Sequence, residues 1–190
     1  ITAINNAMSS AVIISENNTF EFDNILISAG SWSKELALMV GDKFPLDTER
    51  GYHVLFDCDK QLINRPIGWS KSGFYIIQIE DGIRAAGTVE IAGLQREPNL
   101  KRLKMIENET RKIIPSLGKV KSTWLGFRPT LPDSLPVIGQ SIRNKNVFYA
   151  FGHQHLGWTL GAVTGKAITE LVNDRNPNFN LSSFSPSRFN

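Results

Sequence analysis

The chain has 190 residues, of which 41% are hydrophobic and 21% are charged, and its formal net charge at pH 7 is +3. A chain of this length and composition can bury a sizeable core and form one domain or two small ones. No apolar run approaches the ~20 residues that span a bilayer, which excludes a membrane-spanning helix. The small, dispersed charge argues against a nucleic-acid partner, and the basic residues of LKRLKMIENETRK are interpreted as a solvated helix face.

The cysteine content and the first residues indicate the compartment. Cys58 is the only cysteine, so neither an intrachain disulfide nor a multi-cysteine metal site can form. Residues 1–15 have neither the basic start nor the small-residue cleavage pattern of a secretory leader. We therefore expect a cytoplasmic protein, with a peripheral position on the inner face of the membrane as the alternative.

The first predicted elements are strands. The β-like runs 11–15 and 19–22 flank E-N-N, a turn composition, and predict a hairpin. Residues 24–28 (NILIS) predict a buried strand that ends at Ala29 and Gly30. Ligands of open α/β sheets lie beyond the carboxyl ends of strands, so Gly30 is a candidate cofactor contact. A plain turn from strand to helix is the alternative.

A short helix is expected next. Ser31 or Ser33 is the predicted N-cap and Gly41 the predicted end. The apolar side chains expected to pack on one face of this helix are Leu36, Met39 and Val40.

The middle of the chain is predicted to form an antiparallel sheet backed by a helix. The predicted strands are 51–56, 74–79 and 83–86, with 88–92 as a further run, and the turn between the second and third is placed at Asp81 and Gly82. The helix begins near Asn99 and ends before Pro115. Its apolar face is predicted to hold Leu100, Leu103, Ile106 and Ile113.

The stretch 124–164 combines a strand, a glycine-and-histidine turn and a helix. Residues 147–151 predict a buried strand, and GHQHLGWTLG follows it. Four glycines let another group approach closely: Gly152, Gly157, Gly161 and Gly165. A helix start exposes unpaired N–H groups, which favour an anion or an electron-rich oxygen. Tight helix packing is the alternative, and the tail from residue 179 is predicted to be an extended surface strap.

Arg128 is the leading candidate for chemistry. A guanidinium pairs with a carboxylate through two parallel hydrogen bonds, and Pro129 restricts Arg128 to extended backbone angles. Tyr52 is a candidate hydrogen-bond donor to the same carboxylate, and Arg50 a candidate second anchor. The alternatives are a structural ion pair of Arg128 with Asp133 or another acid, and of Arg50 with an acid such as Glu49.

The three histidines could serve a functional role or a structural one. His53 lies next to Tyr52 and, on a strand, points to the opposite face; it is a candidate catalytic residue or a satisfied core or surface histidine. His153 and His155 resemble a metal pair, but no third ligand has plausible spacing, so no metal site is predicted.

The order of these motifs resembles the FAD-dependent D-amino acid oxidase superfamily, nearest to its D-amino acid dehydrogenases and glycine oxidase-like enzymes. The matching motifs are ILISAGSWS, RGYHV, GFRP, PDSLPVIG and GHQHLGWTLG, and the resemblance runs from about residue 11 to the end. It implies an α+β chain. Its expected divisions are 1–43 and 125–190, the C-terminal parts of an α/β FAD-binding domain, and 44–124, an antiparallel-sheet substrate domain.

The resemblance also implies site residues. Arg128 would bind the substrate carboxylate, with Tyr52, His53 and Arg50 nearby, and Trp158 is expected to pack in the core. N–H groups at Leu156 to Thr159 would stabilise charge on the reduced flavin. The implied FAD contacts are Ala29, Gly30, Trp32, Gly152, His153, His155, Leu156, Gly157, Trp158 and Thr159.

The fingerprint G-x-G-x-x-G is absent, and the chain starts at Ile1 in a sheet-forming region. We therefore expect the C-terminal portion of a longer protein, inactive alone, whose missing N-terminal Rossmann segment binds the ADP half of FAD.

The expected activity is dehydrogenation of a small amino acid or amine in amino-acid catabolism, with oxygen, a quinone or a carrier as the electron acceptor. The alternatives are an FAD-dependent oxidoreductase of 2-hydroxy acids or proline-like cyclic amines, and a non-catalytic binding module with the same fold.

Overall fold

The computed structural model describes residues 1–6 and 10–189 and divides into two compact units. Unit 1 joins residues 1–47 to residues 128–190, and unit 2 consists of residues 48–127. The chain passes from one unit to the other within two long strands, β5 (Asp47–Phe56) and β9 (Val120–Thr130). Their boundaries therefore lie a few residues after the divisions expected from sequence.

Unit 1 contains two three-stranded sheets. The first, in order β1-β2-β3, is an antiparallel meander, and it contains the predicted hairpin as β2 and β3. The second has the order β10-β11-β4, with β10 antiparallel and β4 parallel to β11. The strands are β1 (Ala3–Asn6), β2 (Ala11–Ser15), β3 (Asn18–Phe22), β4 (Ile25–Ile27), β10 (Val137–Gln140) and β11 (Val147–Phe151).

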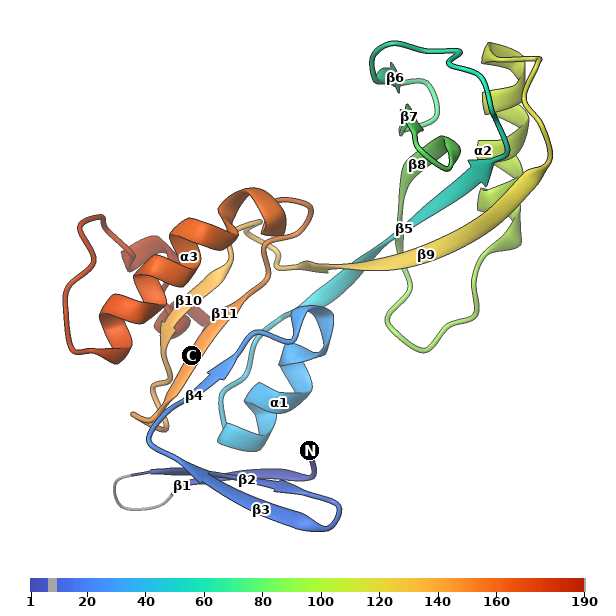
Figure 1. Cartoon of the computed structure of the whole chain (residues 1–190). Coiled ribbons are helices and arrows are strands. Elements are labelled where there is room, and N and C mark those ends of the chain that lie inside the picture. The colour runs from blue at the N-terminus through green and yellow to red at the C-terminus, as the bar shows by residue number, and fades with distance from the viewer. Residues whose placement is uncertain (7–9, 190) are drawn as a thin grey trace. The chain divides into compact units, whose positions relative to one another are not determined.

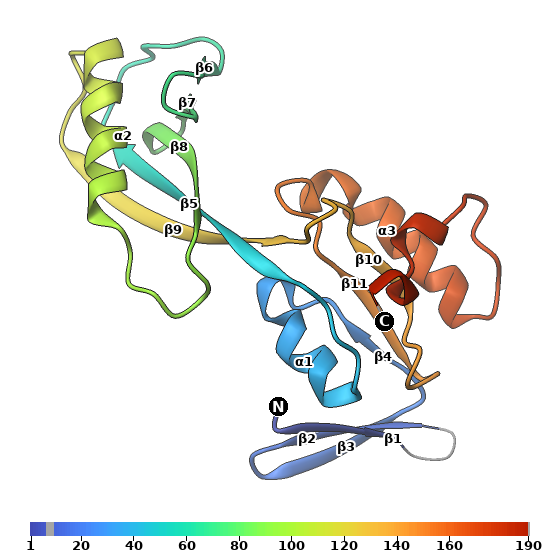
Figure 2. The same ribbon diagram turned by 180° about the vertical axis from the view of Figure 1, so that it is seen from behind.

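Side chains of β11 alternate between two cores of unit 1, as the period of a strand requires. Tyr149 and Phe151 join Phe44 in edge-to-face aromatic contacts, with ring centroids 5.1–5.7 Å apart. Phe148 packs against Ile168 of α3 (Gly157–Val172) on the other face. Figures 1 and 2 show α3 lying along β10 and β11.

The short helix of unit 1 begins differently from the prediction. A 3-10 turn (Gly30–Trp32) leads into α1 (Ser33–Val40), so neither serine caps the helix; Trp32 is the N-cap residue. Gly41 ends α1 in the left-handed conformation, as predicted, with φ 97°. Leu36 and Val40 pack against the core, whereas Met39 is exposed, which corrects the predicted face.

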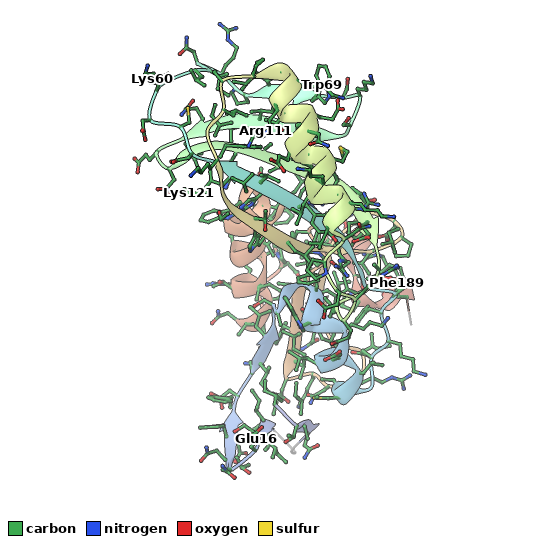
Figure 3. All side chains as sticks on the ribbon, turned by 90° about the vertical axis from the view of Figure 1, so that its right-hand side faces the viewer. Glu16, Lys60, Trp69, Arg111, Lys121 and Phe189 are labelled. Atoms are coloured by element: carbon green, nitrogen blue, oxygen red, sulfur yellow. The ribbon has the colours of Figure 1, made fainter. Side chains whose placement is uncertain are left out.

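Unit 2 is a five-stranded sheet, in order β6-β7-β8-β5-β9, with a helix packed on one face. Tyr52, Val54 and Phe56 of β5 point into that core together with Ile106 of the helix. Figure 3 shows Trp69 beside this helix, where its indole N–H donates to the Glu109 carboxylate at 3.4 Å. The remaining elements are β6 (Ile67–Trp69), β7 (Phe74–Ile79), β8 (Gly82–Ile91) and α2 (Leu100–Ile113).

Three details of unit 2 correct the predictions. The runs 83–86 and 88–92 belong to one strand, β8, since residues 82–91 are continuous. The hairpin turn consists of Glu80 and Asp81, because Gly82 already pairs with Ile79. Leu100 at the start of α2 is exposed instead of lying on the apolar face.

The tail is folded onto unit 1 and is not an extended strap. It forms two 3-10 turns, Ser182–Phe184 and Pro186–Phe189, and Phe189 packs edge-to-face on Phe44. In the part of the chain that the structure describes, no helix combines the length and the apolar character needed to cross a bilayer. The structure is α+β, with antiparallel sheets and few helices.

Candidate functional site

Two glycine-containing turns of unit 1 lie side by side at one edge of the second sheet. β4 and β11 are parallel neighbours, with Ile27 opposite Tyr149. The carboxyl ends of parallel neighbours lie at the same edge, so Gly30, after β4, and Gly152, after β11, follow neighbouring strand ends. Segments separated by about 120 residues in sequence therefore form one surface.

The N-terminus of α3 opens onto this region of unit 1. Leu156 is the N-cap residue, and its side chain makes no capping hydrogen bond. The Leu156 N–H donates to the His153 carbonyl oxygen at 2.9 Å, so it is not available to a ligand, contrary to the prediction. The N–H groups of Gly157, Trp158 and Thr159 have no acceptor within the helix. Three donors at the positive end of the helix dipole thus remain for an electron-rich group.

The glycines of this region serve different purposes. Gly152 has φ +86°, and a Cβ there would lie 2.6 Å from Leu131 Cδ1, so the fold of unit 1 itself requires glycine. A Cβ on Gly157 would meet only His153 Cβ, at 3.8 Å, and one on Gly161 would meet nothing within 4 Å. Gly157 and Gly161 therefore leave space that the described residues do not fill. Open space at the start of α3 thus lies beside uncapped N–H groups, which favour an electron-rich group.

Trp158 is fully exposed, which corrects the prediction that it packs in the core. The N-cap residue Leu156 and Val163 of α3 are also exposed. An apolar surface around the start of this helix is thus open to solvent in the described residues.

The two histidines of the turn differ in environment. His153 Nε2 lies 3.0 Å from Thr164 Oγ1, and burial lowers the pKa of His153. His153 is therefore a neutral tether between the turn and the middle of α3. His155 is exposed. Among the described residues, no three His, Cys, Asp or Glu side chains are grouped as a metal site.

Arg128 lies at the end of β9, next to the turn that precedes α3. The Gln154 N–H donates to the Pro129 carbonyl oxygen at 3.0 Å, which joins the backbone after Arg128 to this turn. Asp133, which the sequence offered as a structural partner of Arg128, instead pairs with Arg188, with Nε 2.7 Å from Oδ2. Arg128, the glycine turns and the start of α3 thus belong to one region of unit 1.

Arg50 and Tyr52 lie inside unit 2, where Glu90 joins them. The Tyr52 hydroxyl donates to Glu90 Oε2 at 2.5 Å and accepts from the Asn99 N–H at 3.0 Å. Arg50 is completely buried, and its Nη atoms donate to the carbonyl oxygens of residues 96 and 97 at 2.6 and 3.0 Å. The hydrogen bond from Tyr52 is the main cause that lowers the pKa of Glu90. The network ties β5 to the segment before α2, so this placement favours a structural role over substrate contact.

Glu90 was missed in the sequence because the strand alternation changes phase. Ile83 and Ala85 point to the core, yet Thr88 has φ 61° and the pairing of β5 with β8 shifts between Arg50 and Tyr52. This bulge turns Glu90 inward. No local pattern marks Glu90, because the sequence shows neither the bulge nor the burial of Arg50.

Replacement of Tyr52 by phenylalanine is expected to destabilise unit 2. The change removes a donor to Glu90 and an acceptor for Asn99, which we expect to cost about 1.5–3 kcal/mol in the free energy of unfolding. Denaturant unfolding of the chain, followed by tryptophan fluorescence, measures it. Tyr75→Phe is the control, because Tyr75 is exposed. Unchanged stability with a higher KM would instead indicate substrate contact by Tyr52.

His53 lies on the opposite face of β5 and stacks on Trp124, with ring centroids 5.4 Å apart. Burial, and then the charge of Arg84, lower the pKa of His53. The imidazole is therefore neutral at pH 7.

A cavity of about 780 Å³ lies elsewhere in unit 2, and none of the predicted site residues lines it. Figure 3 labels two of its lysines, Lys60 and Lys121. Its other lining residues are 57–59, 61, 63–66 and 77–81. Acidic and basic side chains are mixed there, so the cavity indicates no particular ligand.

Comparisons with solved structures identify the fold. Glycine oxidase from Geobacillus kaustophilus matches 98% of this chain and 51% of its own, with a TM-score of 0.88 and 23% identity. L-proline dehydrogenase from P. horikoshii matches 100% of this chain and 53% of its own, with a TM-score of 0.85 and 20% identity.

Comparisons with curated sequences give the family. A D-amino-acid oxidase of Bradyrhizobium diazoefficiens is 38% identical over 183 residues, which are 93% of this chain and 43% of the relative. A D-amino acid dehydrogenase of Paramagnetospirillum magneticum is 28% identical over 94% of this chain and 43% of the relative. The chain thus spans less than half the length of these relatives. The model of the FAD dependent oxidoreductase family matches residues 2–171, and the chain therefore belongs to this family.

Proposed function

We propose that the chain is part of an enzyme that oxidises a small amino acid or amine with FAD. The substrate loses a hydride from its α-carbon and a proton from its nitrogen, and the resulting imine is hydrolysed by water. FAD, when bound, supplies the acceptor for the hydride. The residues of this chain bind and orient the two molecules.

The observation that carries this proposal is the hydrogen bond from the Gln154 N–H to the Pro129 carbonyl oxygen. It joins the backbone beside Arg128 to the turn that opens α3. The guanidinium of Arg128 is the proposed carboxylate ligand, since its planar geometry matches two carboxylate oxygens. The N–H groups of Gly157, Trp158 and Thr159 are the proposed donors to the electron-rich edge of the cofactor.

The remaining predicted contacts fit the same surface of unit 1. Ala29, Gly30 and Trp32 follow β4, and Gly152 to His155 follow the neighbouring β11. We propose that this surface holds the flavin end of FAD, and that a segment outside this chain holds the ADP half. The chain covers under half the length of these curated relatives, which supports this division.

The names of the relatives support amino acids as the substrate class, and both D-amino acids and glycine occur among them. The solved L-proline dehydrogenase supports cyclic secondary amines as a second candidate. 2-Hydroxy acids are a further alternative, because they share the carboxylate of an amino acid, although they lack its nitrogen. A non-catalytic module of the same fold is the alternative from another class.

The test is flavin absorbance in the complete protein that contains this chain. We expect a yellow protein whose flavin bleaches anaerobically with D-amino acids and recovers with oxygen or an added quinone. Parallel trials with L-proline and 2-hydroxy acids separate the substrate classes. A colourless protein, or one whose flavin no candidate reduces, would contradict the proposal.

A further inference from the structure

The loop of residues 131–136, between β9 and β10, packs against the glycine turn that follows β11. Leu131 is only 1% exposed, and its Cδ1 would lie 2.6 Å from a Cβ at Gly152. The Cα of Pro136, at the other end of the loop, would lie 3.6 Å from the same Cβ. The backbone hydrogen bond from the turn to the end of β9, described above, lies next to this loop. The position of the turn therefore depends on the position of the loop.

The loop contains a residue in a backbone conformation that needs support. Ser134 has φ 62°, in the left-handed region that residues other than glycine seldom occupy. Two hydrogen bonds inside the loop shape it: the Ser134 N–H donates to the Leu131 carbonyl oxygen at 2.9 Å, and the Leu135 N–H donates to Asp133 Oδ1 at 3.1 Å. A residue in this region persists where the surrounding contacts hold it.

Arg188 of the C-terminal tail supplies such contacts on both sides of Ser134. Its Nε donates to Asp133 Oδ2 at 2.7 Å, and its Nη2 donates to the Leu135 carbonyl oxygen at 2.7 Å. The planar guanidinium can make both bonds at once, because its N–H groups point in fixed directions. Hydrogen bonds that join a charged donor to a carboxylate are stronger than neutral ones. Arg188 therefore fixes the two residues that flank the left-handed serine.

The guanidinium of Arg188 is itself held in place. Its Nη1 donates to the Ser185 carbonyl oxygen at 3.2 Å, and its Cζ lies 4.3 Å from the centroid of the Phe189 ring. Phe189 in turn packs edge-to-face on Phe44 in the core of unit 1. The side chain of Arg188 is 16% exposed, so most of it is withdrawn from water. The tail thus presents a fixed group to the loop.

The contact between Arg188 and the loop encloses the segment that carries the candidate flavin surface. Asp133 precedes β10, β11, the glycine turn and α3 in sequence, and Arg188 follows them. Between α3 and Arg188, the tail residues Leu181 and Phe184 pack against the core beneath α3. The start of α3 is therefore tied to the end of β9 directly, through the turn, and also through the loop that the tail holds.

We propose that Arg188 is a positioning residue for the flavin end of the cofactor. By holding the residues on both sides of Ser134, it keeps Leu131 against Gly152 and so keeps the N–H groups at the start of α3 in place. The inference rests on the proposed function in taking the group bound there to be flavin. These N–H groups favour negative charge, so their displacement weakens the binding of reduced flavin more than that of oxidised flavin. Arg188 therefore helps to set both the affinity for FAD and its reduction potential.

The test uses the complete protein with FAD. Arg188→Met is expected to lower the affinity for FAD about 3- to 30-fold, less than the ~100-fold that loss of a direct hydrogen bond to a charged group can cause. The reduction potential of the bound flavin should fall as well. Arg188→Lys keeps the charge but not the fork that reaches two acceptors, so it should restore part of both losses. Titration of the apoprotein with FAD, and of the holoprotein with a redox dye, measure the two quantities.

Two control variants separate positioning from a general loss of stability. Arg175→Met removes the same group from an exposed position of unit 1. Ile4→Val removes a buried methylene from the core of unit 1 without touching the loop or the tail. Both controls should keep the affinity and the potential, although Ile4→Val should lower the Tm. Unchanged flavin binding and potential in a folded Arg188→Met protein, or equal changes in Ile4→Val, would overturn the inference.

Amide hydrogen exchange without flavin makes the inference separable from the proposed function. Arg188→Met should speed exchange in peptides that cover residues 131–136 and 152–159, and leave peptides of unit 2 unchanged. In a protein that never holds FAD, the proposed function fails, and unchanged exchange at 152–159 would reject the role of Arg188 as well. A protein whose flavin binds and is reduced normally in the Arg188→Met variant would reject the role of Arg188 alone.

Discussion

Replacement of Arg128 by methionine is expected to lower kcat/KM for amino acids by roughly 30-fold to several thousand-fold in the complete enzyme. The range corresponds to about 2–5 kcal/mol, the cost of removing one member of a desolvated charged pair. Arg128→Lys keeps the charge but loses the two-pronged geometry, so its loss should be smaller. Steady-state kinetics with an amino acid and with an amine that lacks a carboxylate measure the effect.

Comparison of the two substrates shows whether Arg128 binds the carboxylate or supports the fold. The amine never contacts the guanidinium, so its kcat/KM should change little, and the flavin content should stay normal. Arg175→Met is a control for the loss of an exposed arginine in unit 1. An equal loss for both substrates, or release of FAD, would show that Arg128 is structural.

Replacement of Gly157 by valine is expected to remove bound flavin from the complete enzyme. Gly157 has no positive φ, and an added Cβ meets only His153 Cβ at 3.8 Å, so the described residues accept a side chain there. Valine is also no worse than glycine in a helix. The side chain instead occupies the space beside the N–H groups of α3. The ratio of flavin to protein absorbance in the purified variant measures the loss.

Gly165→Val is the matched control, because it makes the same change in α3 two turns further on, again in open space. It should keep its flavin. Normal flavin content in Gly157→Val would place the cofactor elsewhere.

Local patterns in the sequence predicted elements well where one principle decides. The run 147–151 is apolar and bounded by polar turns, and it forms β11 with the expected limits. Asn99 caps α2 by accepting from the Lys101 N–H, and the helix ends before Pro115. Gly41 ends α1 because glycine adopts its positive φ without strain.

Prediction failed where distant residues decide. Alternation along β8 is broken by the bulge at Thr88, so Glu90 and its partnership with Arg50 were not visible. Asp133 was the alternative partner suggested for Arg128, but the tail brings Arg188 to it over 55 residues. Trp158 was assigned to a core from its type alone, although its position in the first turn of α3 exposes it.

In the candidate site, too, local features could be predicted from the sequence and distant contacts could not. Gly30 and Gly152 could be recognised as turn glycines, but their adjacency depends on the pairing of β4 with β11. No local pattern carries that pairing, and the resemblance to a known family implied only that both segments belong to one FAD-binding domain.

The insertion of unit 2 into unit 1 has a consequence for the order of folding. Ile25 of β4 pairs with Val147 of β11, so closing this contact in an unfolded chain requires a loop of about 120 residues. The N–H of Asp57 at the end of β5 bonds to Lys119 just before β9, and these strands are neighbours. Formation of unit 2 from its continuous segment therefore brings its own two ends together.

The remaining loop then shortens to about 40 residues, which lowers the entropic cost of pairing β4 with β11 by about 1 kcal/mol. Unit 2 can form its sheet before unit 1, because all its strand pairs lie within one segment. Unit 2 should thus form first, and β11 should join β4 afterwards. A mutation that slows the formation of unit 2 would then delay assembly of the surface around α3, although it lies in the other unit.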